Sequence, residues 1–127
     1  MSSRRATFRV EAIHPSLNTW SRGNPFKVAG LKKAHDHIAQ AAIHQAKVHG
    51  AWDGQPFERA RVTVRYHFPT AVRHDPDNGA PKFFLDALVA GQVLTDDDFA
   101  HVPELTITSG ERAKPGWTEL IVEEVDA

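Results

Sequence analysis

The sequence has no cysteine and no long apolar run. The first absence excludes disulfides, thiolate zinc sites and cysteine nucleophiles, and it fits a reducing cytoplasm. No apolar stretch approaches the roughly 18 residues that a membrane span needs. The N-terminus carries basic residues without an apolar region behind them, so we expect no signal peptide. The motifs of P-loops, dinucleotide-binding folds and serine hydrolases are also missing.

Positive and negative charges are concentrated in different parts of a chain whose net charge is only −1. Residues 1–73 contain twelve Lys and Arg against four Asp and Glu, whereas residues 74–127 contain three against twelve. A nuclease needs this combination, because basic groups hold the DNA backbone and carboxylates hold a metal ion at the scissile phosphate. The alternative is that the two sets mix in space and form an ordinary solvated surface.

Apolar periodicity predicts a single α+β domain over residues 1–127. Alternation predicts strands, and helical spacing predicts a first helix at 29–48 and a second that Asp77 or Asn78 caps and Gly91 ends. The strands are expected at 4–13, 58–68, 99–108 and 117–125. The order is therefore β-α-β-α-β-β, with a mixed sheet and two helices. Two helices cannot cover both faces of such a sheet, so one face is expected to remain for a partner subunit or nucleic acid.

Two acidic clusters flank the second predicted helix. Asp75 and Asp77 precede it, and Asp96, Asp97 and Asp98 follow it. Pro76 favours an extended backbone at Asp75, so both early carboxylates are expected to point the same way. Grouped carboxylates repel one another unless a cation neutralises them, and oxygen ligands suit Mg²⁺ or Mn²⁺. Taken singly, each cluster is also typical of a helix cap or a solvated turn.

Basic residues suggest how a phosphate substrate is held. Lys82 is expected on the predicted second helix, one turn past its start, where its ammonium group can stabilise charge in the transition state of phosphodiester cleavage. The alternative role is an ion pair with Asp86 one helical turn away. Residues 18–27 are expected to form a polar loop, whose basic and aromatic residues resemble a backbone-binding segment, although a solvated helix start has the same composition. The expected DNA contacts are Asn18, Arg22, Lys27, Lys32, Lys33 and Arg73.

The combined pattern resembles the RusA family of Holliday junction resolvases, in particular its phage-borne members. The similarity rests on D-P-D-N at 75–78 and on K-F-F-L-D-A-L-V-A-G-Q-V-L-T-D-D-D at 82–98. P-S-L-N at 15–18 is similar to the loop that follows the first strand of the family. One departure is an extra residue near 79–81, which places Lys82 one position late relative to Asp77.

The resemblance implies an enzyme that cuts four-way DNA junctions in a bacterial or phage-infected cytoplasm. Asp75, Asp77 and Asp97 are then the essential acids, with Asp96 beside them and Lys82 as the catalytic lysine. The enzyme is expected to be a homodimer that uses Mg²⁺ or Mn²⁺ and leaves 5′-phosphate and 3′-hydroxyl ends. Two other hypotheses stay open: a branched-DNA-binding module without catalysis, and a hydrolase of small phosphate esters.

Overall fold

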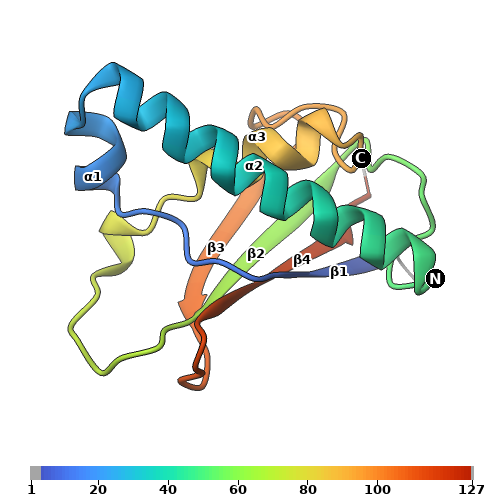
Figure 1. The fold of residues 1–127 in the computed structure, drawn as a ribbon. Helices are drawn as coiled ribbons and strands as arrows, with labels where there is room; N and C mark the ends of the chain where they lie inside the picture. The colour runs from blue at the N-terminus through green and yellow to red at the C-terminus, as the bar shows by residue number, and fades with distance from the viewer. Residues whose placement is uncertain (1–3, 127) are drawn as a thin grey trace.

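The computed structural model describes residues 4–126, which form a small α+β domain (Figure 1). Its elements in chain order are β1 (Arg5–Val10), α1 (Leu17–Arg22), α2 (Pro25–Val48), β2 (Ala60–His67), the 3₁₀ helix η1 (Pro76–Asn78), α3 (Lys82–Ala90), β3 (Glu104–Ser109) and β4 (Trp117–Glu124). The α+β class and the four expected strands are confirmed. The expected count of two helices is wrong, since the structure also contains α1 and η1. Apolar periodicity indicates neither of them.

The four strands form one mixed sheet in the order β1-β4-β2-β3. The last strand, β4, lies between β1 and β2 and runs antiparallel to both. β2 and β3 are parallel neighbours, with Val62 opposite Leu105. A parallel pair needs a long crossover, and α3 lies within this one. This crossover places η1 and α3 between the C-terminal end of β2 and the start of β3.

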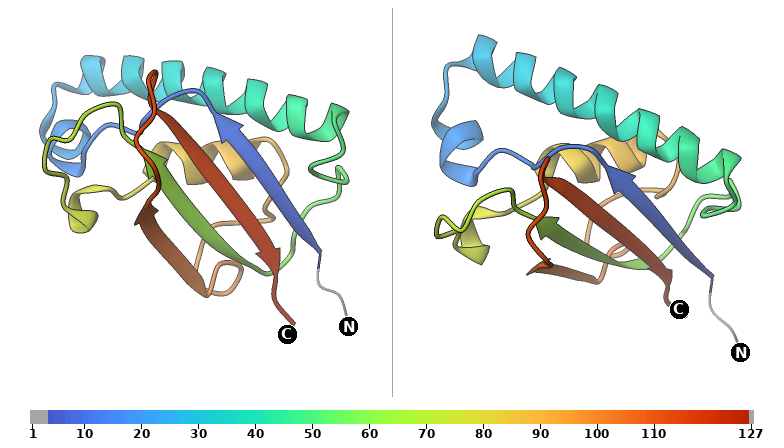
Figure 2. Two further views of the ribbon diagram at one scale, coloured as in Figure 1. Left: turned by 90° about the horizontal axis from the view of Figure 1, so that it is seen from below. Right: turned by 60° about the horizontal axis from the view of Figure 1, so that its bottom comes forward.

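Helices α2 and α3 lie on the same face of the sheet (Figure 2). Alternate strand residues such as Phe8, Val62 and Leu120 point toward them and are almost completely buried. The helices contribute Ile43 from α2 and Phe84 from α3, among others, to the same core. Burying such side chains is the main favourable contribution to folding, at roughly 25 cal/mol per Å² of apolar surface. None of the helices in residues 4–126 has the length and apolar character needed to cross a membrane.

The opposite face of the sheet carries charged residues that pair across strands. Arg61 on β2 lies 2.9 Å from Glu104 on β3, and Arg65 lies 2.8 Å from Glu119 on β4. The strand order brings β1 and β2 from the basic part of the chain next to β3 and β4 from the acidic part. On this face the two charge sets are therefore mixed, as the alternative interpretation of the charge pattern predicted.

Residues 18–27, expected to be a polar loop, are largely helical instead. Ser16 caps α1, and its side chain accepts a hydrogen bond from the Thr19 N–H. Asn24 caps α2 by accepting from the Phe26 N–H at 2.9 Å, and Pro25 occupies the first helical position. The local capping signals extend the helices beyond the apolar periodicity, because caps satisfy free N–H groups without needing a buried face.

The start of α3 also differs from the prediction. Asp77 and Asn78 belong to η1, and α3 begins only at Lys82, with Pro81 in the N-cap position. Neither of the expected residues caps the helix, because Gly79 and the following residues separate η1 from α3. Lys82 is therefore the first residue of α3 rather than a residue one turn inside it. The predicted end at Gly91 is confirmed.

Candidate functional site

The first acidic pair lies in and beside η1, at the end of the molecule that also contains α1 (Figure 1). Asp75 has the extended backbone that Pro76 favours, with φ −96° and ψ 133°. Asp77 is inside the 3₁₀ helix, so the two carboxylates are not alternate residues of one extended segment. The argument that both point the same way therefore fails. Both residues are exposed, and the Asp75 carboxylate is 3.0 Å from the guanidinium of Arg73.

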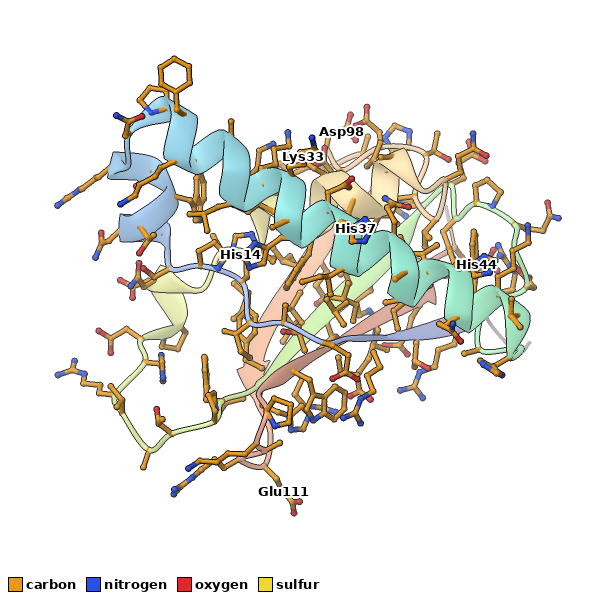
Figure 3. All side chains as sticks on the ribbon, viewed as in Figure 1. His14, Lys33, His37, His44, Asp98 and Glu111 are labelled. Atoms are coloured by element: carbon orange, nitrogen blue, oxygen red, sulfur yellow. The ribbon has the colours of Figure 1, made fainter. Side chains whose placement is uncertain are left out.

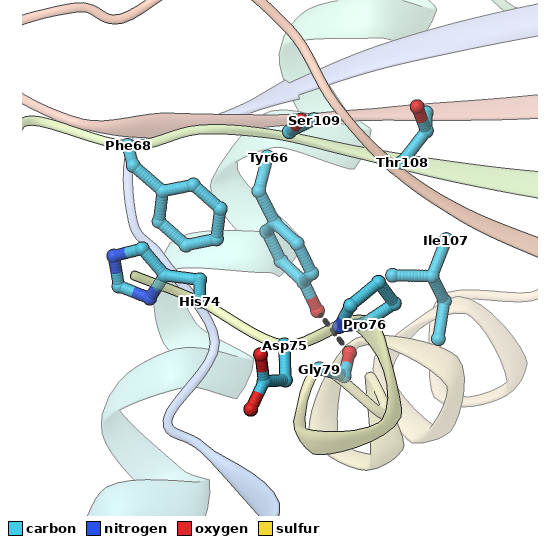
Figure 4. A pocket seen from close by; sticks show the side chains of 9 residues that line it. All are labelled: Tyr66, Phe68, His74, Asp75, Pro76, Gly79, Ile107, Thr108 and Ser109. Atoms are coloured by element: carbon cyan, nitrogen blue, oxygen red, sulfur yellow. Dashed lines mark hydrogen bonds between the residues drawn. The ribbon is translucent and has the colours of Figure 1, made fainter. Parts of the chain in front are cut away.

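A pocket adjoins Asp75 between η1 and the C-terminal ends of β2 and β3 (Figure 4). The Tyr66 hydroxyl donates to the carbonyl of Gly79 at 2.7 Å, which ties the end of η1 to β2. Burial raises the pKa of Tyr66, so this hydroxyl remains a donor at neutral pH. The Phe68 and His74 rings stack with centroids 3.8 Å apart beside it. The sheet thus supports the segment that carries Asp75.

Two segments that are distant in the sequence meet beside this pocket. The backbone N–H of Asn18 donates to Oδ1 of Asn78 at 3.0 Å. This hydrogen bond joins the P-S-L-N and D-P-D-N motifs, and α1 packs against η1 at the same place. A second pocket is lined by His14, directly before P-S-L-N, and by Asp75 and Asn78 of D-P-D-N. The structure therefore brings the two motifs together.

Lys82 is held by an ion pair on α3. Its Nζ lies 3.0 Å from Oδ1 of Asp86, so the alternative role predicted for this lysine is realised. The other oxygen of Asp86 lies 3.2 Å from Nζ of Lys32 on α2. The pKa of Lys82 is raised, first by the hydrogen bond to Asp86 and also by the negative charge of Asp97. Asp97 therefore lies close enough to Lys82 to act on it electrostatically.

The second acidic cluster brings together a set of potential ligands that the sequence did not suggest. Asp96, Asp98 and His101 each offer one ligand atom, and these atoms lie within 4.8 Å of one another. His101 Nδ1 is 2.5 Å from Oδ1 of Asp98. The spacing D-x-x-H at 98–101 was the available signal, since residues three apart in a turn can meet.

The predicted metal ligands do not converge in this conformation. Within residues 4–126, no other group of three acidic or histidine side chains has its ligand atoms within that distance, so Asp75, Asp77 and Asp97 do not form one. Their donor chemistry fits Mg²⁺ or Mn²⁺, because all three offer carboxylate oxygens. Coordination of one ion by all three would require these side chains, or the segments that carry them, to move.

The predicted DNA-contacting residues divide into two groups. Lys32 and Arg73 are already in ion pairs, and Asn18 uses its backbone to bond Asn78. The remaining three are exposed, and in the described part of the chain none of them takes part in an ion pair. They are Arg22 at the end of α1 and Lys27 and Lys33 on the first turns of α2. These cations are available to a polyanion.

His14 is a second residue that the sequence pattern did not indicate. It follows β1, is only 5% exposed, and its Nε2 accepts a hydrogen bond from the N–H of Phe83 at 2.8 Å. Its only sequence signal is its position directly before P-S-L-N. Comparison with known proteins supplies no further residue, because no family model and no curated relative match the chain. The function must therefore be argued from the site.

Proposed function

We propose that this protein is a Mg²⁺- or Mn²⁺-dependent endonuclease of branched DNA. It would resolve four-way junctions as a homodimer, through paired nicks that leave 5′-phosphate and 3′-hydroxyl ends, in a bacterial or phage-infected cytoplasm. The resemblance of residues 15–18, 75–78 and 82–98 to the RusA family motivates the proposal. The α+β fold with its mixed sheet is compatible with it, and so is a sheet face that helices leave uncovered within residues 4–126.

One observation carries the proposal: three separate motif segments gather around the start of α3. Asn18 bonds Asn78 in the D-P-D-N motif, and Lys82 begins the helix four residues later. From the other side, the charge of Asp97 acts on Lys82. Segments that are far apart in the sequence thus lie near the start of α3. This arrangement suits a site in which carboxylates and a cation act on the same phosphate.

Each residue then has a defined task. Asp75, Asp77 and Asp97 would hold the ion, with Asp96 beside them. When bound, the ion neutralises charge on the scissile phosphate and lowers the pKa of an attacking water. Lys82 would stabilise the extra negative charge of the transition state, which requires its ammonium group to exchange Asp86 for the phosphate. Arg73 would exchange Asp75 for a neighbouring phosphate in the same way.

The direct test uses purified protein and synthetic four-way junctions with Mg²⁺ or Mn²⁺. The protein should introduce symmetric nicks, and Asp75→Asn should abolish cleavage while junction binding persists. Glu111→Gln is a suitable control, because Glu111 is an exposed carboxylate in the β3–β4 connection, away from η1 (Figure 3). Junctions that stay intact with every metal and at every pH would refute the enzymatic proposal.

A second function is favoured by the ion pairs seen at the site. Arg73 and Lys82 are both engaged with carboxylates, and the predicted ligands do not converge. A branched-DNA-binding module without catalysis would need neither a free lysine nor a metal site. Such a module should bind junctions with equal affinity with and without Mg²⁺, and Asp77→Asn should change nothing. Calorimetric titration with Mg²⁺ separates the two functions, since only the nuclease should bind the ion through Asp77.

A further inference from the structure

The imidazole of His14 connects the segment after β1 to the start of α3. Its Nδ1 is 2.8 Å from the carbonyl oxygen of Pro15, and its Nε2 is 2.8 Å from the backbone nitrogen of Phe83. A carbonyl only accepts and a backbone N–H only donates. Both bonds therefore form in one state alone, a neutral ring with the proton on Nδ1 and a free lone pair on Nε2.

The helix start that His14 contacts lacks a local cap. Pro81 occupies the N-cap position of α3, and no side chain there accepts a hydrogen bond. The first N–H groups of a helix have no partner within the helix and need one from elsewhere. For Phe83, at the second helical position, the acceptor comes from His14, which is 69 residues earlier in the chain. His14 thus replaces the missing cap.

Aromatic packing holds this cap in position. The His14 ring lies with its centroid 4.9 Å from those of both Phe83 and Phe84 on α3. Trp20 of α1 and His35 of α2 complete the cluster, with centroids 6.5 and 6.1 Å away. In Figure 3, His14 is on the chain segment that passes beside α2 after β1. The three helices that surround the site therefore meet at one side chain.

We propose that His14 is a positioning residue for the reaction, because it caps α3 from outside and so fixes the backbone that presents Lys82. This inference rests on the proposed nuclease function. Asn18, four residues after His14, anchors η1 in the same way through its hydrogen bond to Asn78. Loss of the cap should release the first turn of α3 and displace Lys82 relative to Asp77. A displacement of about 1 Å in such a site reduces catalysis by up to about 100-fold.

The charge state of His14 agrees with this role. Desolvation by burial lowers its pKa to about 4, so the ring is neutral at the pH of the cell. The titratable groups that face it are His35 on α2, whose charge lowers the pKa, and Asp86 on α3, whose charge raises it. Protonation of Nε2 would set a proton against the Phe83 N–H and abolish the cap.

Three variants test the inference. His14→Phe keeps an aromatic ring in the cluster but removes the acceptor, whereas His14→Gln supplies an acceptor near the position of Nε2. His44→Phe is the matched control, because His44 is exposed on α2 (Figure 3). For junction cleavage, His14→Phe should lower kcat by about 10- to 100-fold with KM changed less than about twofold. His14→Gln should restore kcat to within about threefold of the wild type, and a His14→Phe enzyme with wild-type kcat would overturn the inference.

A second measurement does not depend on nuclease activity. In ¹⁵N NMR spectra, the Phe83 amide should show a coupling across the hydrogen bond to Nε2 of His14, and amide exchange at Phe83 and Phe84 should accelerate in His14→Phe. If the wild type cuts no junction, the proposed function fails, and these spectra still decide whether the cap exists. Unchanged exchange in His14→Phe would refute the cap itself. Accelerated exchange with unchanged kcat would confine His14 to a structural role and refute positioning.

Discussion

At the scale of single residues, Lys82 raises the question of whether its ion pair or its charge matters. Asp86 binds both Lys82 and Lys32, yet the two ammonium groups are about half exposed, so the pair contributes at most about 1 kcal/mol. Lys82→Ala should therefore reduce cleavage more than about 100-fold with little change in stability. Asp86→Asn frees the ammonium group and should leave cleavage equal or faster. Single-turnover assays measure the cleavage rates of both variants, and urea unfolding measures their stabilities. Equal losses of cleavage in both variants would show that Lys82 acts only through its ion pair with Asp86.

The His101–Asp98 pair leads to a residue-scale prediction about pH. The hydrogen bond between the two side chains raises the pKa of His101 above the ordinary 6.5, and the same bond lowers the pKa of Asp98. Because the folded pKa of His101 is the higher one, its stabilising effect is complete below pH 6.5 and declines as the pH rises through the folded value. NMR titration should find the imidazole pKa above 6.5. Asp98→Asn should lower it, and an unchanged value would mean that the pair does not persist in solution.

At the scale of elements, two glycines on the helices predict opposite stability changes. A Cβ on Gly91, which ends α3, would lie 2.9 Å from both Gln40 Oε1 and Ile43 Cδ1 of α2. Both atoms are ends of side chains that can shift, so Gly91→Ala should destabilise the fold by at most about 1 kcal/mol through overpacking. A Cβ on Gly30 meets nothing within 4 Å, and Gly30→Ala inside α2 should stabilise by about 0.5–1 kcal/mol. Thermal and urea unfolding of the two variants measure both effects, and a Gly91→Ala variant stabilised as much as Gly30→Ala would contradict the close packing of α2 and α3.

Most of the elements that the sequence predicted correctly have a buried face; β3, which has no buried residue, is the exception. In β2, buried Val62 and Val64 alternate with outward-facing residues such as Arg61 and Arg65, and the sequence itself shows this period of two. The same holds for α2, whose buried residues recur at helical spacing. In contrast, α1 has no buried residue, so no apolar period marked it. Only its capping Ser16 could have indicated a helix.

The assembly of the site could be predicted only in part, for a physical reason. Periodicity tells which face of an element is buried, but it does not tell which loops meet. The Asn18–Asn78 and His14–Phe83 bonds join residues 60 and 69 positions apart, and no local pattern specifies them. The extended geometry of Asp75 was predictable because Pro76 restricts it, whereas no local pattern specified the 3₁₀ turn at Asp77, which packs against α1.

At the scale of the whole molecule, part of the unpaired positive charge lies beside the candidate site. Strands from the basic and acidic parts alternate in the sheet, and ion pairs such as Arg61–Glu104 neutralise its open face. Arg22, Lys27 and Lys33, which form no ion pair within residues 4–126, lie on α1 and the first turns of α2, the end of the molecule that also contains η1. This end therefore combines free positive charge with the candidate site. We expect DNA to approach over α1 and the start of α2 rather than across the sheet.

Salt dependence of junction binding tests this orientation. Each phosphate that the protein neutralises releases counterions, so the plot of log K against log salt should flatten by about 0.9 for every phosphate that a variant leaves unneutralised. Replacing Arg22, Lys27 and Lys33 together with glutamine should weaken binding and flatten the slope. Arg61→Gln removes one positive charge that Glu104 already neutralises, so it should leave the slope unchanged. A flatter slope for Arg61→Gln than for the triple variant would mean that DNA lies across the sheet face instead.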